Sequence, residues 1–171
     1  LGDGALNQGG FFEAMNLAAI WNLPVIFVLE NNSYSMGTHI NRGTAMANDL
    51  SAKAQAFGMR YAECDGLDVL AVYDCFADQV SKTRNAKNPQ WERGNWDKIE
   101  YSREGSTPGP AFINVKTYRY QGHSMSDPQK YRTKDEVGDY KDRDPINIRV
   151  NQLVDAGHAT QDECDAMDKK A

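Results

Sequence analysis

The sequence predicts an α/β protein in which a parallel sheet is flanked by helices. Strand-like apolar runs alternate along the chain with stretches of helical periodicity. Residues 24–29 are continuously apolar and rich in β-branched side chains, which is typical of a parallel strand buried on both faces. At 171 residues, 40% hydrophobic and 25% charged, the chain is large enough for one domain with a substantial core.

The predicted elements follow in order. Residues 2–10 form a polar, glycine-rich turn, and a helix over 11–22 ends before Pro24. After the strand at 24–29, residues 30–33 are predicted to be a loop. A short helix at 51–57 and a strand at 59–64 come next, and Asp68 caps a helix over 69–86. Its expected buried face consists of Val69, Val72, Cys75, Phe76 and Val80.

The C-terminal half contains one further strand, at 111–118, then a polar loop at 121–133 and a helical tail from about Asp144, with Pro145 at its start. Residues 88–107 differ from the rest, since they hold Trp91, Trp96 and many charges with little periodicity. We interpret them as a surface insertion, with a partner-contacting loop as the alternative.

Bulk properties exclude several classes of function. The net charge of −5 lacks the basic footprint of nucleic-acid binding, and no apolar run approaches the ~20 residues of a membrane span. Cys64, Cys75 and Cys164 have neither a metal-ligand spacing nor an even count, which favours reduced thiols in a reducing compartment. Residues 1–4 resemble the end of a strand rather than a leader, so we expect the true start to lie upstream.

Two polar residues stand at the ends of predicted strands. Asp3 lies in a Gly-Asp-Gly turn, and Asn32 follows the strand at 24–29. In a parallel sheet both emerge at the carboxyl ends of the strands, where ligands bind. A hard divalent cation takes oxygen ligands, and a carboxylate, an amide oxygen and a carbonyl near Tyr34 supply three. Each motif alone is weak evidence for a binding site. The combination is stronger evidence: the Gly-Asp-Gly turn, a helix, a buried strand and then Asn31-Asn32, with 26 residues between Gly4 and Asn31. No GxxxxGK[ST] string occurs, which argues against a P-loop.

Three stretches carry a resemblance to a known family. The turn and its spacing to Asn31-Asn32 resemble the thiamine-diphosphate motif. The resemblance is to the alpha subunits of pyruvate dehydrogenase E1. It covers, in the family's order, residues 2–9, 30–38 and 117–128, and the last stretch continues into 131–134. The chain is therefore identified as a member of the thiamine-diphosphate-dependent 2-oxo acid dehydrogenases. The resemblance implies one partial thiamine-diphosphate-binding domain over 1–171.

The resemblance also implies roles for individual residues. Asp3, Asn32 and the Tyr34 carbonyl match the ligands of a Mg²⁺ ion that holds the diphosphate, and Gly4 and Ala5 match residues close to it. His123 matches the loop histidine that reaches the phosphate side of the cofactor and organises the active site; His39 and His158 have no such support.

The loop around His123 contains Ser124 and Ser126, which match serines phosphorylated in mitochondrial relatives. A phosphate would add roughly −1.5 to −2 charge beside the diphosphate. Gln121 and Ser35 depart from the common family pattern. Around residues 129–131 the loop is shorter than in mitochondrial alpha subunits and resembles that of bacterial ones. The shorter loop weakens the phosphorylation hypothesis but not the cofactor hypothesis.

The activity implied is oxidative decarboxylation of pyruvate, with acetyl transfer to the lipoyl group of E2. It would require an E1 beta subunit in an α₂β₂ heterotetramer, because the carboxylate that activates the aminopyrimidine comes from that subunit and the pyrimidine-gripping residues of the alpha subunit lie upstream of Leu1. The implied location is the bacterial cytoplasm, or alternatively the mitochondrial matrix. Alpha subunits of branched-chain 2-oxo acid or acetoin dehydrogenases, and a non-catalytic subunit of the same fold, are the alternatives.

Overall fold

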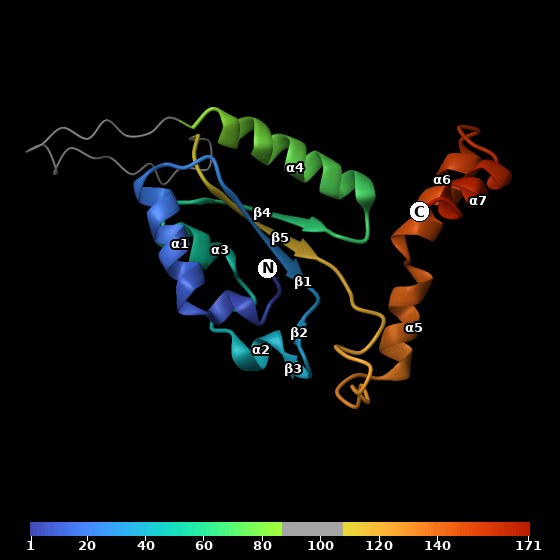
Figure 1. Cartoon of the computed structure of the whole chain (residues 1–171), viewed down its shortest axis with the longest axis horizontal. Helices are drawn as coiled ribbons and strands as arrows, with labels where there is room; N and C mark the ends of the chain where they lie inside the picture. The colour runs from blue at the N-terminus through green and yellow to red at the C-terminus, as the bar shows by residue number, and fades with distance from the viewer. Residues whose placement is uncertain (87–107) are drawn as a thin grey trace, which may run out of the picture.

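The computed structural model describes residues 1–86 and 108–171, and its centre is a parallel sheet. Strands β1 (Ile26–Asn31), β5 (Ala111–Lys116) and β4 (Arg60–Asp65) lie in the order β1-β5-β4, with Ile26 and Arg60 both opposite Ala111. The N-terminal segment adds to the free side of β1, where Gly2 forms a parallel bridge with Glu30. All strands of this sheet therefore run in one direction, and the predicted α/β class is confirmed (Figure 1).

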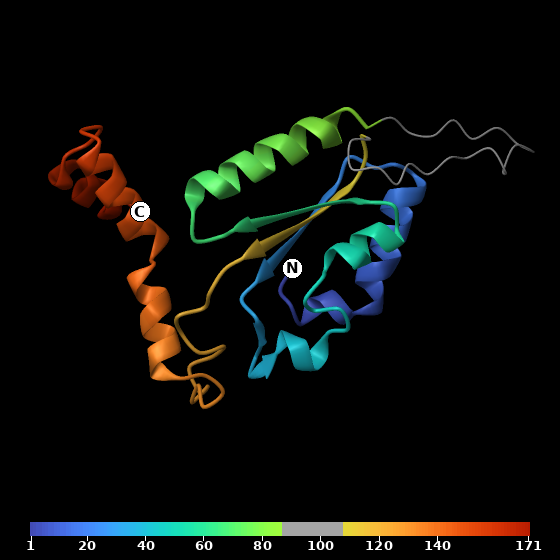
Figure 2. The same cartoon turned by 180° about the vertical axis from the view of Figure 1, so that it is seen from behind.

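Helices cover both faces of this sheet. On one face lie the 3₁₀ turn η1 (Ala5–Asn7), α1 (Gly9–Ile20), α2 (Ile40–Gly43) and α3 (Ser51–Ala56), while α4 (Val69–Arg84) crosses the opposite face (Figures 1 and 2). The main core lies between the sheet and the first group, because apolar side chains of both meet there. Its buried members are Leu6, Met15, Leu29, Ile40, Leu50, Ala54, Met59 and Phe112.

Two predicted boundaries were displaced by the pairing of the strands. The strand predicted at 24–29 runs from Ile26 to Asn31, because the ladder with β5 continues until Asn31 lies opposite Lys116. Glu30 and Asn31 thus belong to a strand, and the prediction of a loop there was wrong. β1 is also only partly buried over residues 26–28, whereas the central strand β5 is fully buried from Ala111 to Asn114. Burial on both faces follows from the central position, which hydropathy alone did not reveal.

The predicted face of α4 is confirmed in part: Val72, Cys75, Phe76 and Val80 are half-buried, and two polar residues pack beside them. Val69 is 50% exposed, whereas Gln79 and Thr83 are buried. Both accept hydrogen bonds from the buried guanidinium of Arg60, at 3.2 Å to Gln79 Oε1 and 2.6 Å to Thr83 Oγ1. A third bond of 2.7 Å reaches the carbonyl of Gly109, so one arginine joins β4, α4 and the chain entering β5.

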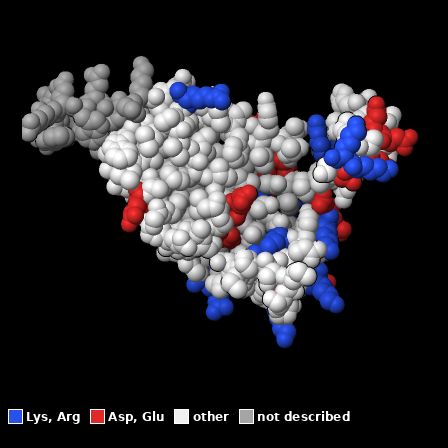
Figure 3. Space-filling model, in the orientation of Figure 1, with Lys and Arg blue, Asp and Glu red and all other residues white. Residues whose placement is uncertain are grey.

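The C-terminal part consists of three helices beyond the carboxyl ends of the strands. α5 (Lys134–Asp142) precedes the predicted tail, which contains α6 (Pro145–Asp155), begun by Pro145 under an Asp144 cap, and α7 (Gln161–Asp168). α5 was not predicted from the sequence. Figure 3 shows that positive and negative side chains are mixed over the C-terminal helices, while much of the remaining visible face carries few charges.

The predicted insertion at 88–107 lies outside the described residues. Within the parts that the structure describes, none of the helices has both the length and the apolar character to cross a membrane. All three cysteines are free, as predicted, and Cys64 and Cys164 are buried.

Candidate functional site

The Gly-Asp-Gly turn places a carboxylate in a buried position at the end of the sheet. Asp3 is 3% exposed, and in the described part of the chain its Oδ2 has no hydrogen-bond partner. Burial raises the pKa of Asp3 above its usual value, although the backbone N–H groups of Asp3 and Asn32 and the positive charge of Arg119 act in the opposite direction. The site thus contains a buried carboxylate oxygen to which none of the described protein groups donates a hydrogen bond.

Asn32 and Tyr34 lie in the turn that leaves β1. The Oδ1 atom of Asn32 accepts a 3.0 Å hydrogen bond from the backbone N–H of Tyr34, which closes a tight polar turn. Ser33, between them, has a positive φ of 67°. Tyr34–Ser35 then forms strand β2, which pairs with β3 (Thr38–His39) in a short antiparallel hairpin. An amide oxygen and a backbone carbonyl are therefore held close together by local structure.

Gly4 fits this turn because it has no side chain. A Cβ atom at Gly4 would lie 2.3 Å from Ser35 Oγ and 3.2 Å from Ser35 Cβ. The Gly-Asp-Gly turn and the chain after Asn32 are thus in direct contact. Ala5, the next predicted residue, is half-buried at the start of η1.

An arginine that the sequence analysis did not single out connects this turn to the loop after β5. Arg119 donates hydrogen bonds to the Met36 carbonyl at 2.9 Å, to the Tyr131 hydroxyl at 3.0 Å and, at 3.5 Å, to the Tyr34 carbonyl. Arg132 lies alongside and donates to the carbonyls of Arg119, Tyr120 (3.0 Å) and Gln121 (2.8 Å). These bonds fold residues 117–133 back onto the hairpin.

Asp127 organises the tip of the same loop. Its carboxylate accepts hydrogen bonds from the Tyr131 hydroxyl at 2.6 Å and from the backbone N–H groups of His123 at 2.8 Å and Gln129 at 2.9 Å. The Tyr131 hydroxyl and these two amides lower the pKa of Asp127 to about 2. The loop conformation is therefore coupled to an ionised Asp127.

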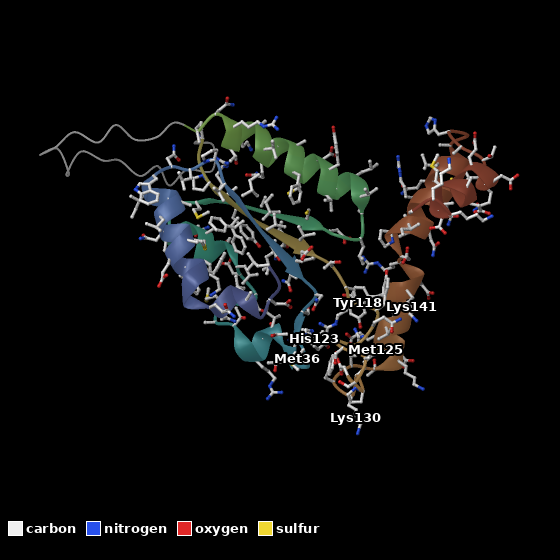
Figure 4. The ribbon with its side chains drawn as sticks, in the orientation of Figure 1. Met36, Tyr118, His123, Met125, Lys130 and Lys141 are labelled. Atoms are coloured by element: carbon white, nitrogen blue, oxygen red, sulfur yellow. The ribbon has the colours of Figure 1, made fainter. Side chains whose placement is uncertain are left out.

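His123 lies in a hollow next to this turn rather than inside it. The hollow has a volume of about 500 Å³ and is lined by His123, Ser124, Ser126, Met36 and the Asp127–Tyr131 part of the loop. Figure 4 shows His123 beside Met36. Ser124 and Ser126 are exposed, with their hydroxyl oxygens 3.1 Å apart. The structure thus brings Asp3, Gly4, Asn32 and Tyr34 together, and places the predicted loop residues at the neighbouring edge.

Helix α5 contributes a second unpredicted residue. Glu136 accepts hydrogen bonds from the hydroxyl groups of Tyr118 at 3.0 Å and Tyr34 at 3.5 Å. Burial, together with Glu136, raises the pKa of Tyr34, and the same causes raise that of Tyr118 to about 12, so both hydroxyls remain protonated donors. The Thr133-x-x-Glu136 pattern was the available sequence signal, since it predicts a helix start.

In composition the site suits an oxygen-coordinated cation bound together with an anionic ligand. The described residues contain no group of three or more His, Cys, Asp or Glu side chains that could hold a metal alone. Mg²⁺ sites commonly need only one or two carboxylates, because phosphate oxygens and water complete the shell. One buried carboxylate, one amide oxygen and one carbonyl meet that requirement.

Comparison with known proteins defines the class to which this fold and site belong. Residues 1–90 and 98–171 match the Dehydrogenase E1 component family, so the chain belongs to that family. Within it, the chain is similar to alpha subunits of the pyruvate dehydrogenase E1 component. It is 43% identical over 170 residues to the protein of Rickettsia typhi and 42% identical over 170 residues to that of Rhizobium meliloti. It is also 36% identical over 169 residues to a chloroplastic alpha-3 subunit of Oryza sativa subsp. japonica.

The coverage of these matches is unequal. They include 99% of this chain, but only 45%, 42% and 35% of the three relatives. The chain thus spans less than half the length of the curated relatives that it matches. The resemblance inferred from residues 2–9, 30–38 and 117–128 is confirmed, and the activity of a whole protein is a separate question.

Proposed function

We propose that this chain is the part of a pyruvate dehydrogenase E1 alpha subunit that binds the diphosphate of thiamine diphosphate through Mg²⁺. The observation that carries the proposal is the buried Asp3 Oδ2 without a partner, beside Asn32 and at the carboxyl ends of parallel strands. A cation bound there would give that oxygen the partner that the protein does not supply.

In this proposal three residues hold the metal. Asp3 gives a carboxylate oxygen, Asn32 its Oδ1 and Tyr34 its backbone carbonyl. The Asn32 oxygen already accepts the Tyr34 N–H, yet a carbonyl oxygen has a second lone pair. Gly4 and Ala5 lie close to the diphosphate, and the missing side chain at Gly4 keeps the backbone near its neighbours.

The loop residues act next to the diphosphate. His123 has an exposed side chain, while its backbone N–H is bound to Asp127, so the ring is free to reorient toward a ligand with the main chain fixed. We propose that His123 reaches the phosphate side of the cofactor. Ser124 and Ser126 are exposed and sterically open to phosphorylation, which stays a hypothesis.

When bound, thiamine diphosphate would supply the electron sink that decarboxylation of a 2-oxo acid needs. The chain's own residues bind and orient its charged end. In our proposal the remaining parts of the site come from the rest of a longer alpha subunit and from an E1 beta subunit in an α₂β₂ heterotetramer. The lipoyl group of E2 accepts the acetyl unit, in the bacterial cytoplasm or alternatively in the mitochondrial matrix.

Pyruvate is favoured over branched-chain 2-oxo acids and acetoin because the pyruvate dehydrogenase relatives match 99% of the chain at up to 43% identity over 170 residues. The test is calorimetric titration of the full-length alpha subunit, assembled with its beta subunit, with thiamine diphosphate in the presence and absence of Mg²⁺. We expect Mg²⁺-dependent binding that Asp3→Ala abolishes. Unchanged affinity in Asp3→Ala would refute the metal assignment, and faster turnover of a branched 2-oxo acid than of pyruvate would refute the substrate.

A further inference from the structure

The chain contains two helices that begin with the same capping pattern but use it differently. In α7 the Glu163 carboxylate returns to the helix start and accepts the Thr160 N–H at 2.8 Å, which completes a reciprocal capping box. In α5 the Thr133 hydroxyl accepts the Glu136 N–H at 3.1 Å, but the Glu136 carboxylate binds the hydroxyl groups of two tyrosines instead. Helix capping therefore does not account for the position of the Glu136 side chain.

The two tyrosines come from neighbouring strands of the sheet. Tyr118 follows β5 and points toward α5, where its ring stacks on Tyr140 at 3.8 Å between centroids (Figure 4). Tyr34 follows β1, and its ring contacts the rings of Tyr131 and His39, each at 5.2 Å between centroids. Glu136 thus joins the ends of β1 and β5 through one half-buried carboxylate.

The backbone at Tyr34 is held by two single hydrogen bonds, since Asn32 Oδ1 accepts its N–H at 3.0 Å and Arg119 donates to its carbonyl at 3.5 Å, and by a very short hairpin. β2 and β3 are two residues each, and the hairpin is bounded by positive φ angles at Ser33 (67°) and Met36 (53°). A hairpin with two residue pairs restricts the orientation of its peptide groups less than a longer hairpin does. A side chain that is hydrogen-bonded at its far end further restricts the backbone to which it is attached. Fixing the Tyr34 ring therefore limits the directions in which the Tyr34 carbonyl can point.

We propose that Glu136 is a positioning residue, which directs the Tyr34 carbonyl toward the metal by holding the Tyr34 hydroxyl; the inference rests on the proposed function. Residues outside the ligand shell that orient metal ligands typically account for ~10–100-fold in metal affinity. Because this tether is a single long bond, we expect the lower end, about tenfold. The tether belongs to the apo protein, so its effect does not require turnover.

The test is a double-mutant cycle on the full-length alpha subunit assembled with its beta subunit. The dissociation constant of Mg²⁺ is measured by calorimetry at saturating thiamine diphosphate for wild type, Tyr34→Phe, Glu136→Ala and the double variant. We expect each single variant to raise the dissociation constant of Mg²⁺ about tenfold. The dissociation constant of the double variant should be no higher than the higher of the two single-variant values. Glu136→Gln, which keeps an acceptor oxygen, should recover part of the loss.

Glu163→Ala is the matched control, since it removes the carboxylate of the same pattern in α7. It should leave the Mg²⁺ constant unchanged while lowering the melting temperature of the apo protein. Additive effects of Tyr34→Phe and Glu136→Ala, or an equal loss in Glu163→Ala, would overturn the role of Glu136. Absence of Mg²⁺-dependent binding in the wild type would instead overturn the proposed function. If Glu136→Ala does not fold, the cycle is run with Glu136→Leu, which also removes the acceptor, and is judged by the same non-additivity.

Discussion

Replacing Asp3 by Asn should stabilise the apo protein and abolish its Mg²⁺ site. Burial raises the pKa of the Asp3 carboxyl, so the folded state disfavours the charge. A carboxyl group whose pKa is higher in the folded than in the unfolded state lowers the free energy of unfolding at pH values where it is ionised. Removing its charge should therefore stabilise the protein near pH 7. The same substitution removes the carboxylate that a divalent cation requires.

The size of the gain follows from the surroundings of Asp3 Oδ2. A buried polar atom without a partner costs about 1–3 kcal/mol. The attraction of Arg119 and two backbone N–H groups already offsets part of this cost and is weakened in the variant. We therefore expect a gain of about 1 kcal/mol, which corresponds to about 2 °C or less in the melting temperature of the larger full-length protein.

The assay is thermal unfolding of the assembled full-length protein, with and without Mg²⁺ and thiamine diphosphate. Wild type at ligand concentrations near 100 times Kd should gain about 2.7 kcal/mol, whereas Asp3→Asn should gain almost nothing. Asp74→Asn removes an equal charge from an exposed position of α4 and should change neither value. A lower apo melting temperature in Asp3→Asn, or a preserved ligand-induced shift, would show that Asp3 is not a destabilising buried charge that binds the cation.

The remaining predictions concern packing, pH and completeness. Gly4→Ala should lower apo stability by about 1–3 kcal/mol, because its Cβ meets Ser35 Oγ at 2.3 Å, and Ser35→Gly in the same chain should restore it; denaturant titration of all three variants checks this, and no rescue would contradict it. Since the pKa of Asp127 is lowered from 3.8 to about 2, its stabilisation of the loop is complete above about pH 4 and fades as the pH falls toward 2. Limited proteolysis at neutral pH should accordingly cut Asp127→Asn faster than wild type at Arg132, and equal rates would count against the coupling. Finally, the 171-residue chain alone should not decarboxylate pyruvate, because it matches only 45% of its Rickettsia typhi relative; robust CO₂ release by the purified chain would disprove this.

The alternation of apolar runs and helical periods predicted the sheet and most of its helices, because those patterns report burial directly. The strand end at Asn31 was not predictable in this way, since pairing with Lys116 on β5 extends a polar stretch of the strand. Arg60 adds polar residues to the packed face of α4, because a buried guanidinium needs hydrogen-bond acceptors such as Gln79 and Thr83, which hydropathy does not indicate. α5 was missed because its nine residues are mostly charged and include Gly138.

The sequence predicted where the proposed site residues lie in the fold, but not the contacts that hold them there. Asp3 and Asn32 were identified because parallel strands bring their carboxyl ends to one edge. The contributions of Arg119 and Glu136 depend on how residues 117–136 fold back onto the hairpin, which spacing does not specify. Gly4 and Ser35 illustrate the same point, since their contact joins residues that the sequence separates by a helix and a strand.

The most direct test of the central claim is an anomalous-difference map of the assembled full-length protein, crystallised with thiamine diphosphate and Mn²⁺ in place of Mg²⁺. Mn²⁺ accepts the same oxygen ligands and can be located unambiguously. We predict one peak per alpha subunit within about 2.0–2.3 Å of a carboxylate oxygen of Asp3, Oδ1 of Asn32 and the carbonyl oxygen of Tyr34. A diphosphate-bound Mn²⁺ that contacts none of these three atoms would contradict the account.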